Sequence, residues 1–153
     1  MPVVVTGAAG FIGAAVVRRL VGLGEHVVAV DRRPGSRRPG VRTLTADLLD
    51  ADDAVSAALR SADAVVHLAG CPGVRDNRPD VAHHRRRDNL DAATRVLDAV
   101  PRGVPVVVAS SSSVYGGTRG GRPSAETDPL APIGGYALSK AAVEALCADH
   151  AVA

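Results

Sequence analysis

The sequence has no tryptophan, only one phenylalanine and two tyrosines, and a single lysine. Its 153 residues are 46% apolar, mostly Ala, Val and Leu, and such small residues favour closely packed layers of helix on sheet. The two cysteines, Cys71 and Cys147, are far apart and outside any zinc-ligand spacing, and they are too few for a disulfide framework. This cysteine usage fits a reducing environment, so we expect a cytoplasmic protein.

Other absences narrow the function further. No apolar run reaches 18 residues, and no charged N-terminal region with a cleavage site is present, so we expect neither a membrane span nor a targeting segment. The net charge is only +2 and no basic stripe is interleaved with aromatics, which argues against a nucleic-acid partner. The Gly-x-Ser-x-Gly turn of many hydrolases is missing. His83 and His84 are adjacent and point to different faces of a helix, which argues against a metal site.

Short apolar runs alternate with stretches of helical spacing. The runs at residues 3–6, 26–30, 64–68 and 104–109 have the length and valine content of buried parallel strands, and residues 41–45 form a weaker fifth run. Helical spacing covers residues 11–23, 51–59, 81–100 and 136–150. This order predicts an α/β fold, a Rossmann-type parallel sheet with helices on both faces. Residues 32–40 and 116–135 are predicted loops, and the second is long enough to suggest a function.

The only lysine, Lys140, follows Tyr136 by four residues. In a helix, this spacing places both side chains on one face, about one turn apart. An ammonium near a phenol stabilises the phenolate and brings the phenol pKa down from about 10. The pair is therefore a candidate general acid/base, and a surface helix with a chance Tyr and Lys is the alternative.

Three glycines, Gly7, Gly10 and Gly13, lie between the first predicted strand and the first predicted helix. Glycines there permit a tight turn and let backbone N–H groups approach a pyrophosphate at the helix N-terminus. Asp31 ends the next predicted strand, where a carboxylate accepts hydrogen bonds from a ribose 2′-OH; a turn-starting aspartate is the alternative. Arg32 would suit a 2′-phosphate instead. Because Asp31 would repel that phosphate, we expect NAD and leave NADP open.

Six motifs follow one another along the chain: TGAAGFIG at 6–13, DLLD at 47–50, HLAG at 67–70, NLDAAT at 89–94, SSSSVYG at 110–116 and YALSK at 136–140. Together they resemble the extended short-chain dehydrogenase/reductases, and within them the NAD-dependent epimerase/dehydratase group, which acts mostly on nucleotide sugars. The resemblance covers essentially the whole chain. Its first motif follows the TGxxGxxG pattern of this family rather than GxGxxG.

The resemblance implies which residues form the site. Ser111, Tyr136 and Lys140 would be catalytic: Tyr136 takes a proton from the substrate hydroxyl, Lys140 tunes the tyrosine and holds the nicotinamide ribose, and Ser111 binds the reacting oxygen. The implied cofactor contacts are Gly7, Gly10, Phe11, Ile12, Gly13, Asp31, Arg32, Asp47, Leu48, Leu68, Ala69, Gly70, Asn89, Tyr136 and Lys140. Local alternatives remain for Asp47 as a helix-start residue, for Asn89 as a cap and for the four serines as a polar turn. We assign His67 no catalytic role.

The resemblance also indicates a subclass and a length. Dehydratases of the family carry Asp-Glu directly after the catalytic Ser or Thr, whereas here Ser112 and Ser113 occupy those positions. This leaves an epimerase, a reductase or a decarboxylase. The expected partner is a small-molecule substrate, a nucleotide sugar. Family members run to ~300 residues, so we expect residues 1–153 to be an NAD(P)-binding Rossmann domain without its sixth strand and substrate-binding part. An uncovered strand edge invites association, and a homodimer is left open. The alternatives are an inactive NAD-binding module, an NAD(P)-dependent reductase of the same family and an assembly protein.

Overall fold

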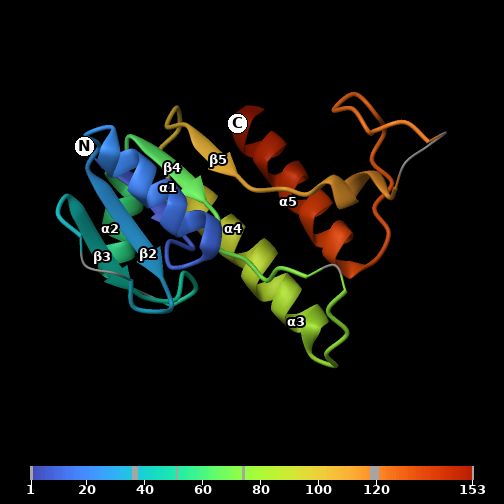
Figure 1. The fold of residues 1–153 in the computed structure, drawn as a ribbon, viewed down its shortest axis with the longest axis horizontal. Helices are drawn as coiled ribbons and strands as arrows, with labels where there is room; N and C mark the ends of the chain where they lie inside the picture. Colours follow the sequence, from blue (N-terminus) through green and yellow to red (C-terminus); the bar gives the residue numbers. More distant parts are fainter. Residues whose placement is uncertain (1, 36–37, 51, 74, 118–120, 153) are drawn as a thin grey trace. The chain divides into compact units, whose positions relative to one another are not determined.

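The computed structural model describes residues 2–35, 38–50, 52–73, 75–117 and 121–152 (Figure 1). The chain forms two compact units: the first comprises Met1–Ala69 and Ala92–Ala109, and the second comprises Gly70–Asp91 and Ser110–Ala153. Ala51, the predicted first residue of a helix, lies outside the described residues. So do residues 36–37 and 118–120 of the two predicted loops.

The first unit is built on a parallel sheet of five strands, β1 (Val3–Thr6), β2 (Val27–Asp31), β3 (Val41–Thr45), β4 (Ala64–His67) and β5 (Val106–Val108). Their order across the sheet is β3-β2-β1-β4-β5, and each neighbouring pair is parallel. The chain thus adds strands on one side of β1 and then moves to its other side. In such sheets ligands bind at the carboxyl ends of the strands beside this reversal. The predicted α/β fold is confirmed.

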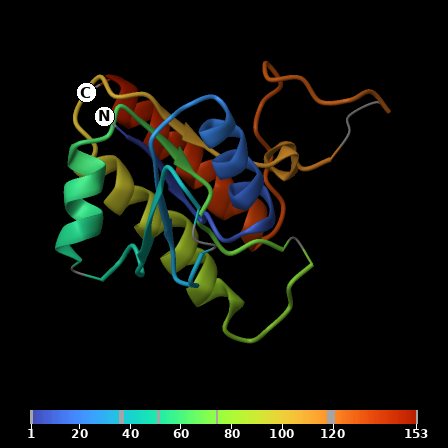
Figure 2. The same cartoon turned by 60° about the vertical axis from the view of Figure 1, so that its left-hand side comes forward.

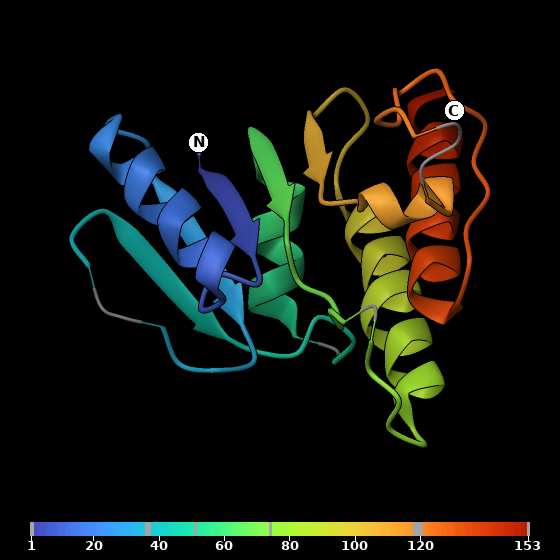
Figure 3. The same cartoon turned by 45° about the vertical axis from the view of Figure 1, so that its right-hand side comes forward.

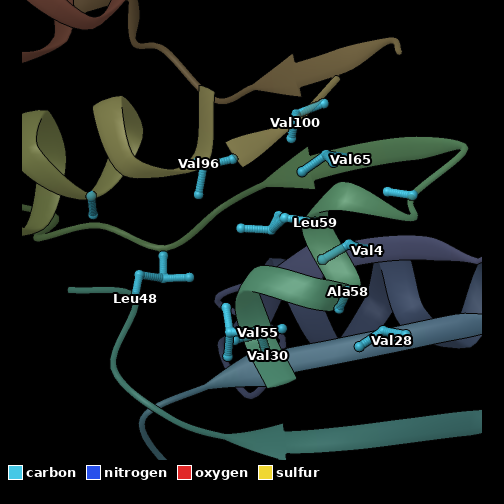
Figure 4. Close-up of a cluster of buried hydrophobic side chains, with 12 residues drawn as sticks. Val4, Val28, Val30, Leu48, Val55, Ala58, Leu59, Val65, Val96 and Val100 are labelled. Atoms are coloured by element: carbon cyan, nitrogen blue, oxygen red, sulfur yellow. The ribbon is translucent and has the colours of Figure 1, made fainter. Parts of the chain in front are cut away.

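Helices cover both faces of this sheet, because alternate strand residues point to opposite sides. Val3, Val5 and Val27 pack with Val17 of α1 (Phe11–Gly22) on one face. On the other face, Val4 packs into a cluster with residues of α2 (Asp53–Arg60) and α4 (Ala92–Ala99), drawn in Figure 4. Val4 and Val5 are both 0% exposed, so β1 is the centre of the first unit.

The second unit contains α3 (Val81–Arg85), a π-helical turn (Arg86–Asp91), a 3-10 turn (Ser112–Tyr115) and α5 (Gly135–Val152). Residues 75–80, which lead into α3, curve back to the start of that helix (Figure 2). The π-helical turn and α3 lie beside α5 (Figure 3). Ala137 and Val143 of α5 are buried, as is Val114 of the 3-10 turn.

One predicted helix is corrected by the structure. Residues 81–100 form α3, the π-helical turn and α4 in succession, rather than one regular helix. A π-helical turn contains an additional residue per turn. It is rare, and it persists where other interactions compensate for its less favourable backbone geometry. Here the turn contains Asn89, whose buried side chain is hydrogen-bonded to two other segments of the second unit. Periodicity alone does not reveal such a turn.

Strand β5 is shorter than predicted, because residues 104, 105 and 109 lie outside it. Pro105 has no N–H to donate to a ladder. Its carbonyl still accepts a hydrogen bond from the Val65 N–H at 2.9 Å, and Ala109 N–H donates to the His67 carbonyl at 3.3 Å. The pairing with β4 therefore continues at both ends of the short strand.

Candidate functional site

The glycine turn between β1 and α1 is built around Gly7, which has a φ of +66°. A Cβ atom at this position would lie 2.6 Å from the backbone nitrogen of Ala69, so only glycine fits. A Cβ on Gly13 would collide with the carbonyl oxygen of Gly7. The two glycines therefore let α1 begin directly against the end of β1.

The N-terminus of α1 is open. Gly10 is its N-cap and provides no side-chain hydrogen bond, and no acidic residue lies in the first turn. Phe11 and Ile12 are 97% and 61% exposed. Unpaired N–H groups and the positive end of the helix dipole favour an anion at such a terminus.

The carboxylate of Asp31 lies at the end of β2, facing the glycine turn. Its Oδ2 accepts a hydrogen bond from the Ala9 N–H at 3.0 Å, and its Oδ1 accepts one from the Arg33 N–H at 2.9 Å. These bonds fix the orientation of the side chain. Asp31 also lines a cavity of about 150 Å³ together with Ala8 and Ala9 of the turn and Arg38 of the following loop. The predicted pairing of the glycine turn with Asp31 is present within the first unit.

Asp47 lies just after β3 and is paired with Arg32. The Nη1 of Arg32 is 3.7 Å from the Oδ2 of Asp47. The Oδ1 of Asp47 accepts a hydrogen bond from the Leu49 N–H at 3.0 Å, which anchors the carboxylate. Leu48, predicted beside it at the cofactor, has a side chain that is only 7% exposed and belongs to the same buried cluster as Val4 and Val55 (Figure 4).

Thr6 organises the end of β4, where Leu68 and Ala69 were predicted to contact the cofactor. Its Oγ1 lies 2.7 Å from the Nδ1 of His67 and accepts hydrogen bonds from the N–H groups of Leu68 at 3.2 Å and Ala69 at 3.3 Å. Thr6 is 0% and His67 is 3% exposed. His67 is thus a buried, hydrogen-bonded histidine at a strand end, as expected for a residue with a structural role.

In the second unit, Tyr136 and Lys140 lie on the first turns of α5, four residues apart, and both are half-buried. Burial lowers the pKa of Lys140 from its ordinary value, because desolvation disfavours the ammonium. The phenol and the ammonium lie four residues apart on one face of the helix, a spacing suited to a proton-transfer pair.

Ser139, between these two residues, links α5 to the rest of the second unit. Its hydroxyl donates to the Tyr136 carbonyl at 2.7 Å and accepts from the Nδ2 of Asn89 at 2.9 Å. Asn89 Oδ1 in turn accepts a hydrogen bond from the Cys71 N–H at 2.7 Å, and its Nδ2 also lies 3.3 Å from the Cys71 carbonyl. Asn89 and Ser139 are 2% and 8% exposed. A Cβ at Gly70 would lie 2.8 Å from Asn89 Oδ1, so this contact also requires a glycine.

Asn89 therefore has a structural role, in addition to the contact with the cofactor that the resemblance predicts. All three polar contacts of its side chain are to the protein, so it connects the segment after β4 with the first turn of α5. Ser139 was not predicted as a site residue. Its only signal is its position inside the YALSK motif, between the two predicted catalytic residues.

Ser111 caps the 3-10 turn. Its Oγ accepts hydrogen bonds from the Ser113 N–H at 3.2 Å and from the Ser113 hydroxyl at 2.9 Å. Ser111 also lines a cavity of about 570 Å³ within the second unit, with Ser112, Tyr115, Glu126 and Glu144. Since its oxygen accepts two hydrogen bonds, its own O–H is suited to donate to an oxygen of a ligand.

Comparison with known proteins assigns these two units to a family. The chain matches the NAD dependent epimerase/dehydratase family over residues 3–153. The protein belongs to this family. Its solved relatives include MoeE5 in complex with UDP-glucuronic acid and NAD, 39% identical with a TM-score of 0.86, where the match covers 100% of this chain and 50% of that one. A UDP-glucuronic acid 4-epimerase from Bacillus cereus, in complex with UDP-glucuronic acid and NAD, is 28% identical with a TM-score of 0.86, over 98% of this chain and 52% of that one.

Curated family members are similar at the same level. The UDP-glucose 4-epimerase of Mycolicibacterium smegmatis is 33% identical over 94% of this chain and 49% of its own length. The uncharacterized UDP-glucose epimerase YtcB of Bacillus subtilis is 31% identical over 96% of this chain and 51% of its own length. The chain thus spans about half the length of the curated family members that it matches.

Among the described residues, no group of three or more His, Cys, Asp or Glu side chains is arranged to hold a metal ion. In the same part of the chain, no helix is long and apolar enough to cross a membrane.

Proposed function

We propose that this chain carries the NAD-binding and proton-transfer residues of an epimerase that acts on a UDP-sugar. The first turns of α5 carry the proposal, because they bring a phenol and the only ammonium of the chain onto one helix face, with Ser139 fixed between them by Asn89. In family members of known structure, the ligands are NAD and UDP-sugars. The combination of family and residue types supports a redox reaction at a sugar hydroxyl.

The residues around the glycine turn fit a dinucleotide. A Cβ at Gly7 or Gly13 would collide with backbone atoms, so the glycines permit the tight turn, and the α1 N-terminus offers N–H groups to a pyrophosphate. Asp31 has a fixed carboxylate that can accept hydrogen bonds from ribose hydroxyls. We infer that these residues hold NAD, with Gly10, Phe11, Ile12, Asp47 and Ala69 as further contacts. Bound NAD supplies reversible hydride acceptance.

The residues of α5 would then handle the proton. Tyr136, as phenolate, takes the proton of a sugar hydroxyl, and Lys140 stabilises that phenolate as an ammonium. Ser111, whose oxygen already accepts two hydrogen bonds, donates a hydrogen bond to the reacting oxygen and stabilises the charge that develops there. Return of the hydride to the opposite face of the same carbon, with return of the proton to its oxygen, would invert the stereocentre.

The subclass rests on two positions after Ser111. Ser112 and Ser113 have no acidic group for the elimination step of a dehydratase. In the structure the Ser113 hydroxyl donates a hydrogen bond to Ser111 Oγ. The relatives named as UDP-glucose or UDP-glucuronic acid epimerases support inversion of a UDP-sugar. A UDP-hexose or UDP-hexuronic acid is therefore the substrate class that we propose.

The experiment tests binding and chemistry separately. NAD binding to the purified chain is measured by calorimetry, and reduction of bound NAD or epimerisation is then followed with UDP-glucose and with UDP-glucuronic acid. Tyr136→Phe, which removes only the phenol oxygen, should reduce turnover by at least ~100-fold, the range of general acid/base catalysis. Lys140→Arg keeps the charge but not the compact ammonium, and should also reduce turnover.

The outcomes are distinct. Epimerisation that Tyr136→Phe abolishes without loss of NAD binding supports the assignment. Turnover that persists in Tyr136→Phe overturns the role of the tyrosine. NAD binding without any turnover indicates a binding module rather than an enzyme, and a folded chain that does not bind NAD contradicts the proposed function as a whole.

A further inference from the structure

Two arginines directly follow Asp31, and the proposed NAD site does not explain them both. Arg32 and Arg33 are exposed cations at the end of β2, where a 2′-phosphate of NADP would be recognised. Cations at this position ordinarily favour NADP, whereas Asp31 favours NAD. What decides between them is how the arginines are held.

In the structure each arginine forms an ion pair with a carboxylate. Arg33 lies on Asp31 itself, with its Nε 3.6 Å from the Oδ1 that also accepts the Arg33 N–H. Arg32 lies on Asp47, at 3.7 Å. The two pairs use different carboxylates, so the two cations are held in different directions.

The pair between Arg32 and Asp47 follows from the sheet. In the parallel register Asp31 lies opposite Thr45, and the Ala46 N–H donates to the Asp31 carbonyl at 3.0 Å. Arg32 follows Asp31 by one residue and Asp47 follows Thr45 by two, so both side chains leave the same end of two neighbouring strands. The Asp47 side chain is 16% exposed and anchored on the Leu49 N–H, whereas the Arg32 side chain is 52% exposed. The aspartate is the fixed member of the pair.

We propose that Asp47 strengthens the preference for NAD over NADP that Asp31 sets, because it holds Arg32 and keeps the guanidinium from a 2′-phosphate. This inference rests on the proposed NAD function. Loss of the Asp47 charge frees the Arg32 guanidinium to approach a 2′-phosphate. It also removes a negative charge that would repel that phosphate. Both effects favour the ligand that carries the 2′-phosphate, which NADP has and NAD lacks.

A contact between Asp47 and the adenine, which the family resemblance implies, would behave differently. NAD and NADP share the adenine, so loss of that contact weakens both by the same factor. The ratio of the two dissociation constants isolates the effect of Arg32. This ratio is the quantity to measure.

The experiment compares NAD and NADP binding to the full chain by calorimetry at one low salt concentration. Asp47→Asn retains an acceptor for the Leu49 N–H, and it should shift the ratio of dissociation constants toward NADP by about three- to fivefold, the equivalent of one exposed ion pair. Asp50→Asn is the matched control: it removes the same charge from the same segment, where Asp50 is exposed, and it should leave the ratio unchanged. The double variant Asp47→Asn with Arg32→Met should lose the gain.

Three results would overturn the inference. One is a ratio that Asp47→Asn does not change although NAD still binds, which leaves the proposed function intact. Another is a gain in NADP affinity that survives Arg32→Met. The third is a selective loss of NADP affinity when Arg32→Met is introduced alone, with Asp47 intact, because it would show that Arg32 already binds the 2′-phosphate. A folded chain that binds neither dinucleotide contradicts the proposed function and the inference together.

Discussion

The side-chain amide of Asn89 donates a hydrogen bond to the hydroxyl of Ser139 at 2.9 Å, although the two residues are 50 positions apart. One lies in the π-helical turn and the other in the first turns of α5, between Tyr136 and Lys140. Through Asn89 Oδ1 the same contact reaches the backbone of Cys71. The rotation of the helix that carries the proposed proton-transfer pair is thus fixed by a residue on another element.

Removing this link should destabilise the protein. Asn89→Ala leaves the buried Cys71 N–H without its acceptor, so we expect a loss of about 1–3 kcal/mol in the free energy of unfolding. Ser139→Ala should cost about 1–2 kcal/mol, because it removes the partner of a buried amide. Ser61→Ala, which removes an exposed hydroxyl bonded to the Ala57 carbonyl, is the matched control and should cost at most about 0.5 kcal/mol. Urea unfolding measures all three, and equal losses for Ser139→Ala and Ser61→Ala would contradict the role of the link.

The glycine turn gives a second prediction. Gly7→Ala introduces a Cβ 2.6 Å from the Ala69 nitrogen at a position with φ of +66°, so it should destabilise the protein by more than ~1 kcal/mol and abolish NAD binding. Gly22→Ala, at the end of α1, meets no atom within 4 Å and should raise stability by about 0.5–1 kcal/mol. Thermal unfolding and calorimetric NAD titration distinguish the two variants. An unaltered NAD affinity in a folded Gly7→Ala protein would exclude the turn from the cofactor site.

The third prediction concerns pH. Burial lowers the pKa of Lys140 below its ordinary 10.5. Between the folded and unfolded pKa values the unfolded chain binds more protons, so this residue makes stability rise with pH up to about 10.5. Lys140→Met removes the effect, and the stability of the wild type relative to this variant should therefore increase as pH rises through that window. Urea unfolding of both proteins at several pH values measures the difference; a difference that stays constant would show that Lys140 is solvated.

The sequence predicted the elements whose pattern is local. The bounds of β1 and β3 agree with the predicted runs at 3–6 and 41–45, because each is a short valine- or threonine-containing run followed by turn residues. The start of α1 at Phe11 was predicted from the helical spacing of residues 11–23. The π-helical turn was not predicted, because it depends on hydrogen bonds from Asn89 to residues 18 and 50 positions away.

The candidate site divides in the same way. Glycine spacing, a strand-end aspartate and the Tyr136–Lys140 spacing indicated a dinucleotide-binding chain with a proton-transfer pair, and the family match confirmed the resemblance. The motif names Leu48 as a cofactor residue; in the structure its side chain belongs to the core, and its contact with the cofactor stays a prediction. A motif states which residue types recur, not which atoms a given chain exposes.

The sequence by itself determined the alternation of strands and helices, the glycine turn and the family, because each depends on residues that are close together along the chain. Only the tertiary structure decided which carboxylate holds Arg32 and which residue fixes Ser139. Those pairs depend on strand register and on the packing of one helix against a π-helical turn. Contacts of this kind join distant positions, and their energies arise only once the backbone has brought the partners within hydrogen-bond or ion-pair distance.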